Sequence, residues 1–151
     1  MFNNAFFMNI AYENALLALH SDEVPVGAVI VKDTKIIARA HNLVEKNKNA
    51  LHHAEILCIQ EACKTLGEKY LIGCDLYVTL EPCIMCAGAI AHVKFRRVYF
   101  GAYDPKRGSV EHALQVFKYT NHKPEVYGGI CEKKCKILLC DYFKTKRVLS
   151  C

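Results

Sequence analysis

The sequence predicts an α/β layered domain with a mixed central sheet. An apolar β-hairpin pattern near the N-terminus is followed by segments that alternate between strand-like and helix-like periodicity. The chain has 151 residues, of which 52% are hydrophobic, and this is enough for one domain with an ordinary core. We therefore expect a single domain over residues 1–151.

Each expected element follows from a local pattern. Helices are predicted where apolar residues recur every three or four positions, and strands where short β-branched or aromatic runs end at turn residues. Gly27, in the first strand, either lets another backbone or a ligand approach closely or marks a bulge. The expected helices are 9–20, 53–66, 83–93, 110–119 and 132–147, and the expected strands are 26–31, 35–40, 74–80, 97–102 and 124–127.

Composition excludes several classes of protein. No run of about eighteen apolar residues is present, so no membrane span is expected. No Lys or Arg precedes Lys32, which argues against a secretory signal. The odd number of cysteines, nine, favours reduced thiols and a cytoplasmic protein. Cys131, Cys135 and Cys140 have no nearby fourth ligand, so core or helix positions are favoured over a second metal site.

The net charge of +5 is unevenly distributed. Basic residues gather in 94–107 and again in 133–147. Such asymmetry suggests a polyanionic partner. The alternative on charge alone is a basic helix that is merely solvated.

A metal-ligand pattern begins directly after the strand expected at 74–80. Pro82 suits the first turn of a helix, and Cys83 and Cys86 follow at a spacing that places both sulfurs on one helix face. The positive end of the helix favours thiolates there. Upstream, residues 53–55 read His-Ala-Glu, and the two motifs together match the known signature of zinc nucleobase deaminases. Either motif alone is weak, whereas both in this order are specific.

The expected ligands are His53, Cys83 and Cys86, with the fourth zinc position left to water. His52 is a rival ligand, but the spacing of the motif selects His53. On an ideal helix His53 and Glu55 lie about 200° apart, so they converge on one point only if the helix N-terminus faces that point. The helix that begins near Cys83 must face it too, which predicts two helix N-termini at one metal.

Beyond these motifs, the chain resembles the bacterial tRNA-specific adenosine deaminases over almost its whole length. The resemblance implies a three-layer α/β/α fold of the cytidine deaminase type with a mixed central sheet, one zinc ion per chain and a homodimer. The residues that carry it are 23–29, 53–55, 76–90, 98–102 and 104–106.

The implied reaction is hydrolytic deamination of the wobble adenosine, position 34, to inosine in a tRNA anticodon loop. Zinc would activate a water molecule, and Glu55 would shuttle its proton. The resemblance also assigns substrate contacts to Asn42, Asp104, Lys106 and Phe143. The chain departs from the family at two positions, where it carries Tyr103 and Tyr142, and both residues keep an aromatic surface there.

Two other functions compete with this one. A deaminase of free bases or nucleosides, such as a guanine deaminase, would share both metal motifs. A zinc-stabilised RNA-binding module without activity would share the basic segments. The loop at 104–106 and the basic C-terminus argue against the first, and Glu55 with an open zinc position argues against the second.

Overall fold

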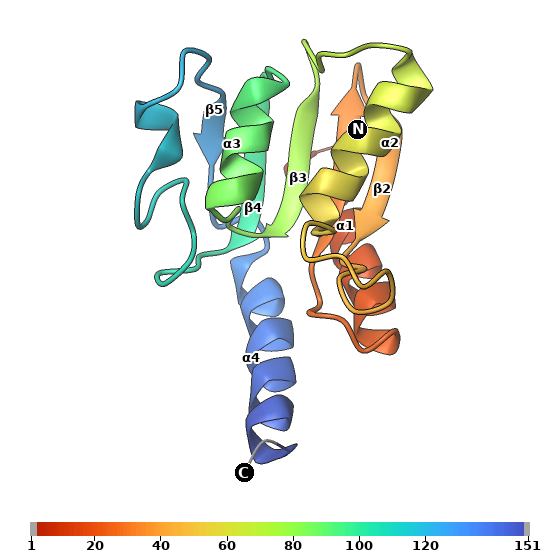
Figure 1. Ribbon diagram of the computed structural model, residues 1–151, viewed down its shortest axis with the longest axis vertical. Coiled ribbons are helices and arrows are strands. Elements are labelled where there is room, and N and C mark those ends of the chain that lie inside the picture. Colours follow the sequence, from red (N-terminus) through yellow and green to blue (C-terminus); the bar gives the residue numbers. More distant parts are fainter. Residues whose placement is uncertain (1–2, 150–151) are drawn as a thin grey trace.

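A five-stranded mixed sheet forms the centre of the molecule (Figure 1). The computed structural model describes residues 3–149, so Met1, Phe2, Ser150 and Cys151 lie outside the described residues. The strand order is β2-β1-β3-β4-β5, in which β1 runs antiparallel to both neighbours and β3, β4 and β5 are parallel. The strands are β1 (Gly27–Lys32), β2 (Lys35–His41), β3 (Asp75–Leu80), β4 (Arg97–Ala102) and β5 (Glu125–Tyr127).

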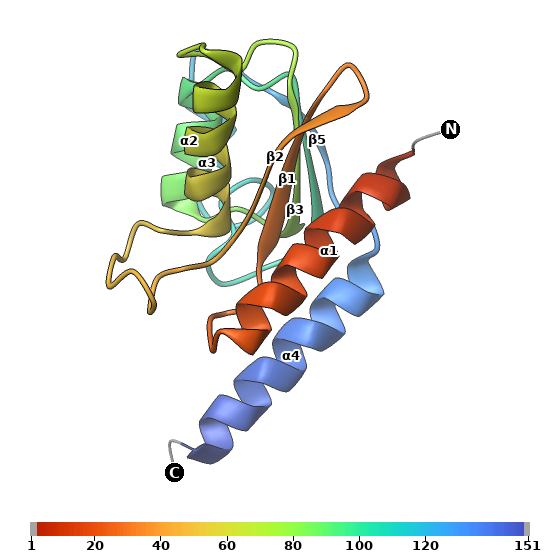
Figure 2. The ribbon, with the colours of Figure 1, turned by 90° about the vertical axis from the view of Figure 1, so that its right-hand side faces the viewer.

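Helices cover both faces of this sheet. Figure 2 shows α2 and α3 on one face and α1 with α4 on the other, which confirms the predicted three-layer α/β/α fold. Within residues 3–149 no helix is both long and apolar enough to cross a membrane. The helices are α1 (Asn4–His20), α2 (Ala54–Leu66), α3 (Ile84–His92) and α4 (Glu132–Leu149), with one short 3₁₀ helix, η1 (Val116–Lys118).

The strand register places two helix N-termini at one edge of the sheet. Leu80 at the end of β3 pairs with Ala102 at the end of β4, and we call this side the C-terminal edge. The α3 helix starts four residues after β3 ends, and α2 starts at the same edge after the loop that follows β2 (Figure 1). In parallel sheets this edge is where ligands usually bind.

Gly27 is explained by close packing of α1 on the sheet. A Cβ atom at Gly27 would lie 2.0 Å from the carbonyl oxygen of Ala11 and 2.5 Å from the backbone nitrogen of Ala15. Any side chain at this position would therefore push α1 off β1. The bulge in this strand pair lies elsewhere, between Ile30 and Val31.

The first helix begins earlier than the sequence pattern predicts. It starts at Asn4 instead of residue 9, because the Asn3 side chain accepts a hydrogen bond of 2.9 Å from the Phe6 backbone N–H and caps the helix. The added turn buries Phe7 and Met8 against the sheet. The other strands and helices start and end within two residues of their predicted limits, with one exception.

The predicted helix over 110–119 is wrong. Only η1 forms there, and Ala113 and Gln115 adopt left-handed backbone conformations with φ of 46° and 50°. The backbone N–H groups of residues 110–112 donate to the carboxylate of Glu81, so the backbone does not wind into an α-helix. A contact with a distant side chain has overridden the local helical pattern.

Candidate metal centre and active site

The starts of α2 and α3 bring the three predicted metal ligands together. His53 is the residue before α2, Cys83 is the residue before α3, and Cys86 lies in the first turn of α3. The Nδ1 atom of His53 lies 3.6 Å from the Cys83 Sγ and 3.5 Å from the Cys86 Sγ. In the part of the chain that the structure describes, these residues form the one group of three or more potential ligands whose atoms lie within 4.8 Å of one another.

This donor set fits a zinc ion. Tetrahedral zinc with Zn–S bonds near 2.3 Å and Zn–N bonds near 2.0 Å holds its sulfur and nitrogen ligands about 3.5 Å apart. The two observed separations of the His53 nitrogen from the sulfurs agree with this value. One imidazole and two thiolates also leave one tetrahedral position for water, as in catalytic zinc sites.

Hydrogen bonds within the cluster set the charge of its thiols. The Cys86 thiol and the His53 ring donate to the Cys83 sulfur and, against the opposing effect of burial, lower the pKa of Cys83 to about 4. The bond with Cys83 and burial raise the pKa of Cys86, which is the donor of the pair. The contact with Cys83 also raises the pKa of His53. One thiolate is thus already favoured, and it is the form that binds a metal.

Glu55 completes the site from the first turn of α2. Glu55 is 4% exposed, and burial raises the pKa of its carboxyl group above the ordinary value. The carboxyl group also interacts with the Cys86 thiol, so it lies directly against the metal ligands. A carboxyl group whose pKa is moved towards neutrality is suited to taking up and returning a proton.

The rival ligand His52 is not part of the cluster. Its Nδ1 lies 2.9 Å from the Asn47 side-chain nitrogen, within the loop between β2 and α2. The same loop is held by Glu23, which is 1% exposed and accepts the backbone N–H groups of Glu45 and Lys46 at 2.9 Å each. The sequence did not predict this anchoring role, although Glu23 lies in the segment 23–29 that carries the family resemblance.

Asn42 has a structural role that the sequence did not reveal. Its Oδ1 accepts the Ala54 backbone N–H at 2.7 Å, and its Nδ2 donates to the Val24 carbonyl oxygen at 3.1 Å. The first contact caps α2, whose own N-cap residue, His53, makes no side-chain capping bond. One amide hydrogen of Asn42 is left for a substrate. The predicted base contact at Asn42 is therefore compatible with the structure. The same side chain would have to make this contact and its two structural hydrogen bonds together.

Replacing Asn42 by alanine is expected to lower the free energy of unfolding by about 1–3 kcal/mol, because a buried donor and a buried acceptor lose their partner. Urea denaturation measures this change. The control is Asn47→Ala in the same loop, where the side chain is exposed and a loss within about 0.5 kcal/mol is expected. Equal stability of the two variants would show that the cap on α2 is unimportant.

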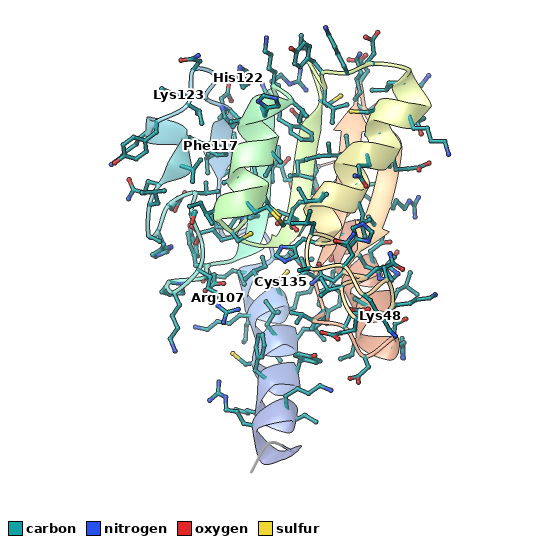
Figure 3. The ribbon with its side chains drawn as sticks, in the orientation of Figure 1. Lys48, Arg107, Phe117, His122, Lys123 and Cys135 are labelled. Atoms are coloured by element: carbon teal, nitrogen blue, oxygen red, sulfur yellow. The ribbon has the colours of Figure 1, made fainter. Side chains whose placement is uncertain are left out.

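Asp104 and Lys106 lie in the loop that follows β4, at the C-terminal edge. The Oδ1 atom of Asp104 accepts the backbone N–H groups of Lys106 and Arg107 at 3.3 and 3.1 Å, so this side chain shapes the turn. Lys106 is exposed. Figure 3 shows Arg107 at the same end of the molecule as Lys48, which lies in the loop after β2.

The basic segment 94–107 does not form one face. Arg96 and Arg97 lie at the opposite edge of the sheet, where Arg96 pairs with Asp75 at 2.8 Å and Arg97 pairs with Glu125 at 3.2 Å. Of the two lysines in this segment, Lys94 precedes β4 and only Lys106 lies after it, at the edge of the sheet that holds the metal ligands. The basic residues that gather in 94–107 are therefore divided between the two edges of the sheet and cannot all contact one RNA.

The α4 helix extends past the C-terminal edge of the sheet and lies beside α1 (Figures 1 and 2). Lys134 donates to Asn9 on α1, and Lys146 pairs with Asp22 at 2.7 Å. Phe143, the predicted aromatic contact, is 41% exposed and packs edge-on against Tyr142 with ring centroids 5.3 Å apart. This helix thus carries exposed aromatic and basic groups beyond the end of the sheet that holds the metal ligands.

Two helix N-termini at one point, two thiols and one imidazole that leave an open position, and a buried carboxyl group against them define a class of protein, the zinc-dependent hydrolytic deaminases. Comparison with known protein families supports this class. The family model described as the cytidine and deoxycytidylate deaminase zinc-binding region matches residues 1–102.

Similar curated proteins narrow the assignment. A tRNA-specific adenosine deaminase of Agrobacterium fabrum is 44% identical over 150 residues, covering 98% of this chain and 99% of the relative. That of Rickettsia bellii is 46% identical over 144 residues, covering 93% and 99%, and that of Bacillus subtilis is 45% identical over 150 residues, covering 97% and 92%. The chain belongs to the zinc-binding deaminase family, on the branch of the tRNA-specific adenosine deaminases.

Solved structures give the same result. One from a study of A-to-I editing by tRNA:A34 deaminases at the wobble position of transfer RNA is 46% identical, with a TM-score of 0.87 over 88% of this chain and 98% of the other. A guanine deaminase from Bacillus subtilis is 38% identical but has a TM-score of 0.65 and covers 68% and 66%. The tRNA deaminase structure therefore resembles this chain more completely.

Proposed function

We propose that this protein hydrolyses the wobble adenosine, position 34, of a tRNA anticodon loop to inosine. The observation that carries the proposal is the buried Glu55 against the cluster of His53, Cys83 and Cys86. The names of the similar proteins and the tRNA:A34 deaminase structure support the choice of substrate. One domain, residues 1–151, would carry the whole activity.

In the proposed site His53, Cys83 and Cys86 would hold one zinc ion. A zinc ion held in this way would lower the pKa of a bound water to about 7 and so supply a nucleophile at neutral pH. Glu55 would take a proton from the attacking water and deliver it to N1 of adenine. The C6–O bond forms, Glu55 moves the second proton to the amino group, and the C6–N bond breaks to release ammonia.

We assign substrate positioning to four side chains. The remaining amide hydrogen of Asn42 and the carboxylate of Asp104 contact the flipped base and its neighbours. Lys106 contacts phosphate, and Phe143 stacks on a splayed loop base, an interaction typically worth about 1–3 kcal/mol. A wobble base is already partly unpaired, so extruding it costs little.

One assay tests the proposed function. The protein is incubated with an RNA anticodon stem-loop that carries adenosine at position 34, and inosine is measured. Free adenosine, guanine and cytidine are the comparison substrates. We expect strong preference for the stem-loop, whereas faster release of ammonia from guanine would identify a free-base deaminase. Binding of the stem-loop without any turnover would instead support the RNA-binding module.

RNA binding is expected to weaken steeply with salt. Replacing Lys144, Lys146 and Arg147 together by glutamine should reduce the slope of log affinity against log salt, by about 0.7 for each phosphate that the protein no longer neutralises. Fluorescence anisotropy with the stem-loop between 50 and 200 mM salt, roughly the range over which such interactions weaken, measures the slope.

The matched control removes the same charge at the opposite edge of the sheet, by replacing Lys35, Lys69 and Lys94 with glutamine. Its slope should equal that of the wild-type protein. If both triple variants change the slope equally, α4 is not the RNA-binding face and the effect is one of net charge.

We also propose a homodimer that acts in the cytoplasm. Leu51 and Ile84 support an interface near the site, because they lie beside the metal ligands and are 58% and 57% exposed. The eight described cysteines are all unpaired, as expected in a reducing compartment. Light scattering should give twice the chain mass of 17.1 kDa.

A further inference from the structure

Glu81 is a buried carboxylate that the proposed reaction does not use. Its residue is 2% exposed and its side chain has no exposed surface. It follows β3, and its own backbone N–H donates to the Ala102 carbonyl oxygen at 2.8 Å, so its position is fixed by the sheet. Burying an acidic group is costly unless it is paired or hydrogen-bonded, which makes its partners informative.

All hydrogen-bond partners of its carboxylate lie in the loop of residues 103–112. The Oε1 atom accepts the backbone N–H of Asp104 at 3.1 Å and lies 2.8 Å from Nδ1 of His112. The Oε2 atom accepts the backbone N–H groups of Val110, Glu111 and His112 at 3.3, 2.8 and 3.0 Å. Five donors thus converge on one carboxylate, and they come from both ends of the loop.

The loop also wraps closely around this carboxylate. A Cβ atom at Gly108 would lie 2.4 Å from the Glu81 Cδ and 2.6 Å from the Asp104 carbonyl oxygen, so any side chain at this position would displace one of them. Gly108 pairs with Cys83 in an isolated β-bridge, and the Ser109 backbone N–H donates to the Pro82 carbonyl oxygen at 2.9 Å. The loop is therefore attached to the backbone that presents a metal ligand.

We propose that Glu81 is a positioning residue that holds the 103–112 loop, and with it Asp104 and Lys106, at a fixed place relative to Cys83. Through this loop Glu81 sets how the polynucleotide around the reacting base is held. Glu81 itself contacts neither the base nor the rest of the substrate. The kinetic part of this proposal rests on the proposed function, while the loop contacts stand independently of it. A charged acceptor suits the task because its hydrogen bonds are stronger than those of a neutral amide.

Replacing Glu81 by glutamine tests the proposal. Glutamine has nearly the same shape, but its NH₂ group would face N–H groups whose hydrogen bonds the carboxylate accepts in the wild-type protein. We expect hydrogen exchange at the amides of Asp104 and residues 110–112 to accelerate about 10-fold or more, the factor for losing a charge-assisted hydrogen bond. Amides of β3 and α3 should keep their rates, and zinc should stay at one per chain.

Kinetics distinguish positioning from a general loss of stability. With the anticodon stem-loop, KM of the Glu81→Gln protein should rise about 10-fold or more while kcat changes by less than about threefold. Glu68→Gln, an exposed residue elsewhere on the surface, is the control and should match the wild-type protein. A fall in kcat at unchanged KM would place Glu81 in the chemical step and overturn the proposal.

A second pair of variants serves if the Glu81→Gln protein does not fold. His112→Ala removes one of the five donors, from a side chain that is 37% exposed. His112→Asn places an amide nitrogen where Nδ1 was and should restore both the slow exchange and the low KM. Unchanged exchange and KM in His112→Ala, or no recovery in His112→Asn, would overturn the proposal. If no variant, nor the wild-type protein, deaminates the stem-loop, the proposed function fails, and the exchange data still decide the role of Glu81.

Discussion

Replacing Glu55 by glutamine is expected to stop deamination while the protein stays folded and keeps its zinc. Glutamine has nearly the same shape but cannot take a proton from water or return one to the base. General acid–base catalysis is typically worth about 10²–10⁴-fold, and Glu55 is assigned more than one proton transfer, so the rate should fall by at least that factor. Inosine formation under single-turnover conditions measures the chemical step directly.

The matched control for this variant lies on the same helix. Glu61 is exposed on α2, and Glu61→Gln should deaminate at the wild-type rate. Affinity for the stem-loop and zinc content should be the same in both variants and in the wild-type protein. A Glu55→Gln protein with near wild-type turnover would remove this residue from the mechanism, and loss of its zinc would mean that Glu55 belongs to the metal site instead.

No loss of stability is expected from this change. Glu55 is buried, and burial raises its pKa, which means that the surroundings disfavour the charged form. A neutral glutamine avoids that cost, so after a chelator has removed zinc from both proteins the variant should resist urea at least as well as the wild-type protein at neutral pH. Charge buried for catalysis at the expense of stability is common at active sites.

The metal site was predictable because its signals are local. Cys83 and Cys86 share the start of one helix, and Pro82 marks where that helix begins, so neighbouring residues alone define half of the site. His53 lies thirty residues upstream of Cys83, and it was joined to the cysteines by the match to the known zinc deaminase signature. The angular separation of His53 and Glu55 then predicted that the helix N-terminus faces the metal, and the structure places His53 directly before α2.

Long-range contacts explain what the sequence did not predict. The apolar pattern of 110–119 favours a helix, but Glu81 captures its first N–H groups from the end of β3. Asn42 similarly caps α2 from twelve residues upstream of Ala54. Neither interaction produces a repeating pattern of apolar residues in the sequence. In each case one polar side chain accepts backbone N–H groups of a segment that comes later in the chain.

Contiguity in the sequence was also misleading for the basic segment 94–107. Its middle, Arg97–Ala102, is the strand β4, and an extended strand of this length separates its two ends by about 16 Å. Charges before and after such a strand must lie at opposite edges of the sheet. A basic segment that contains a predicted strand should therefore be divided before it is assigned to one surface.

Loss of Cys86 is expected to remove the zinc ion and to destabilise the fold. The Cys86→Ala variant leaves two ligands, one from each helix start, and two ligands do not hold zinc tightly. Because the metal joins α2 to α3, its binding energy is also folding energy, and a ligand present at about 1,000 times its Kd contributes about 4 kcal/mol. Elemental analysis should give one zinc per wild-type chain and none per variant chain.

Cys58→Ala is the control that separates metal loss from loss of packing. Cys58 and Cys86 are both 0% exposed, and each loses one sulfur atom on replacement, but Cys58 lies on the far side of Glu55 along α2 and is not among the metal ligands. Its variant should keep one zinc and lose roughly 1–2 kcal/mol of stability, as for other small cavities in a core. A chelator should lower the melting temperature of the wild-type and Cys58→Ala proteins but leave that of Cys86→Ala unchanged. Full zinc retention in Cys86→Ala, or two zinc ions per wild-type chain, would refute the ligand assignment.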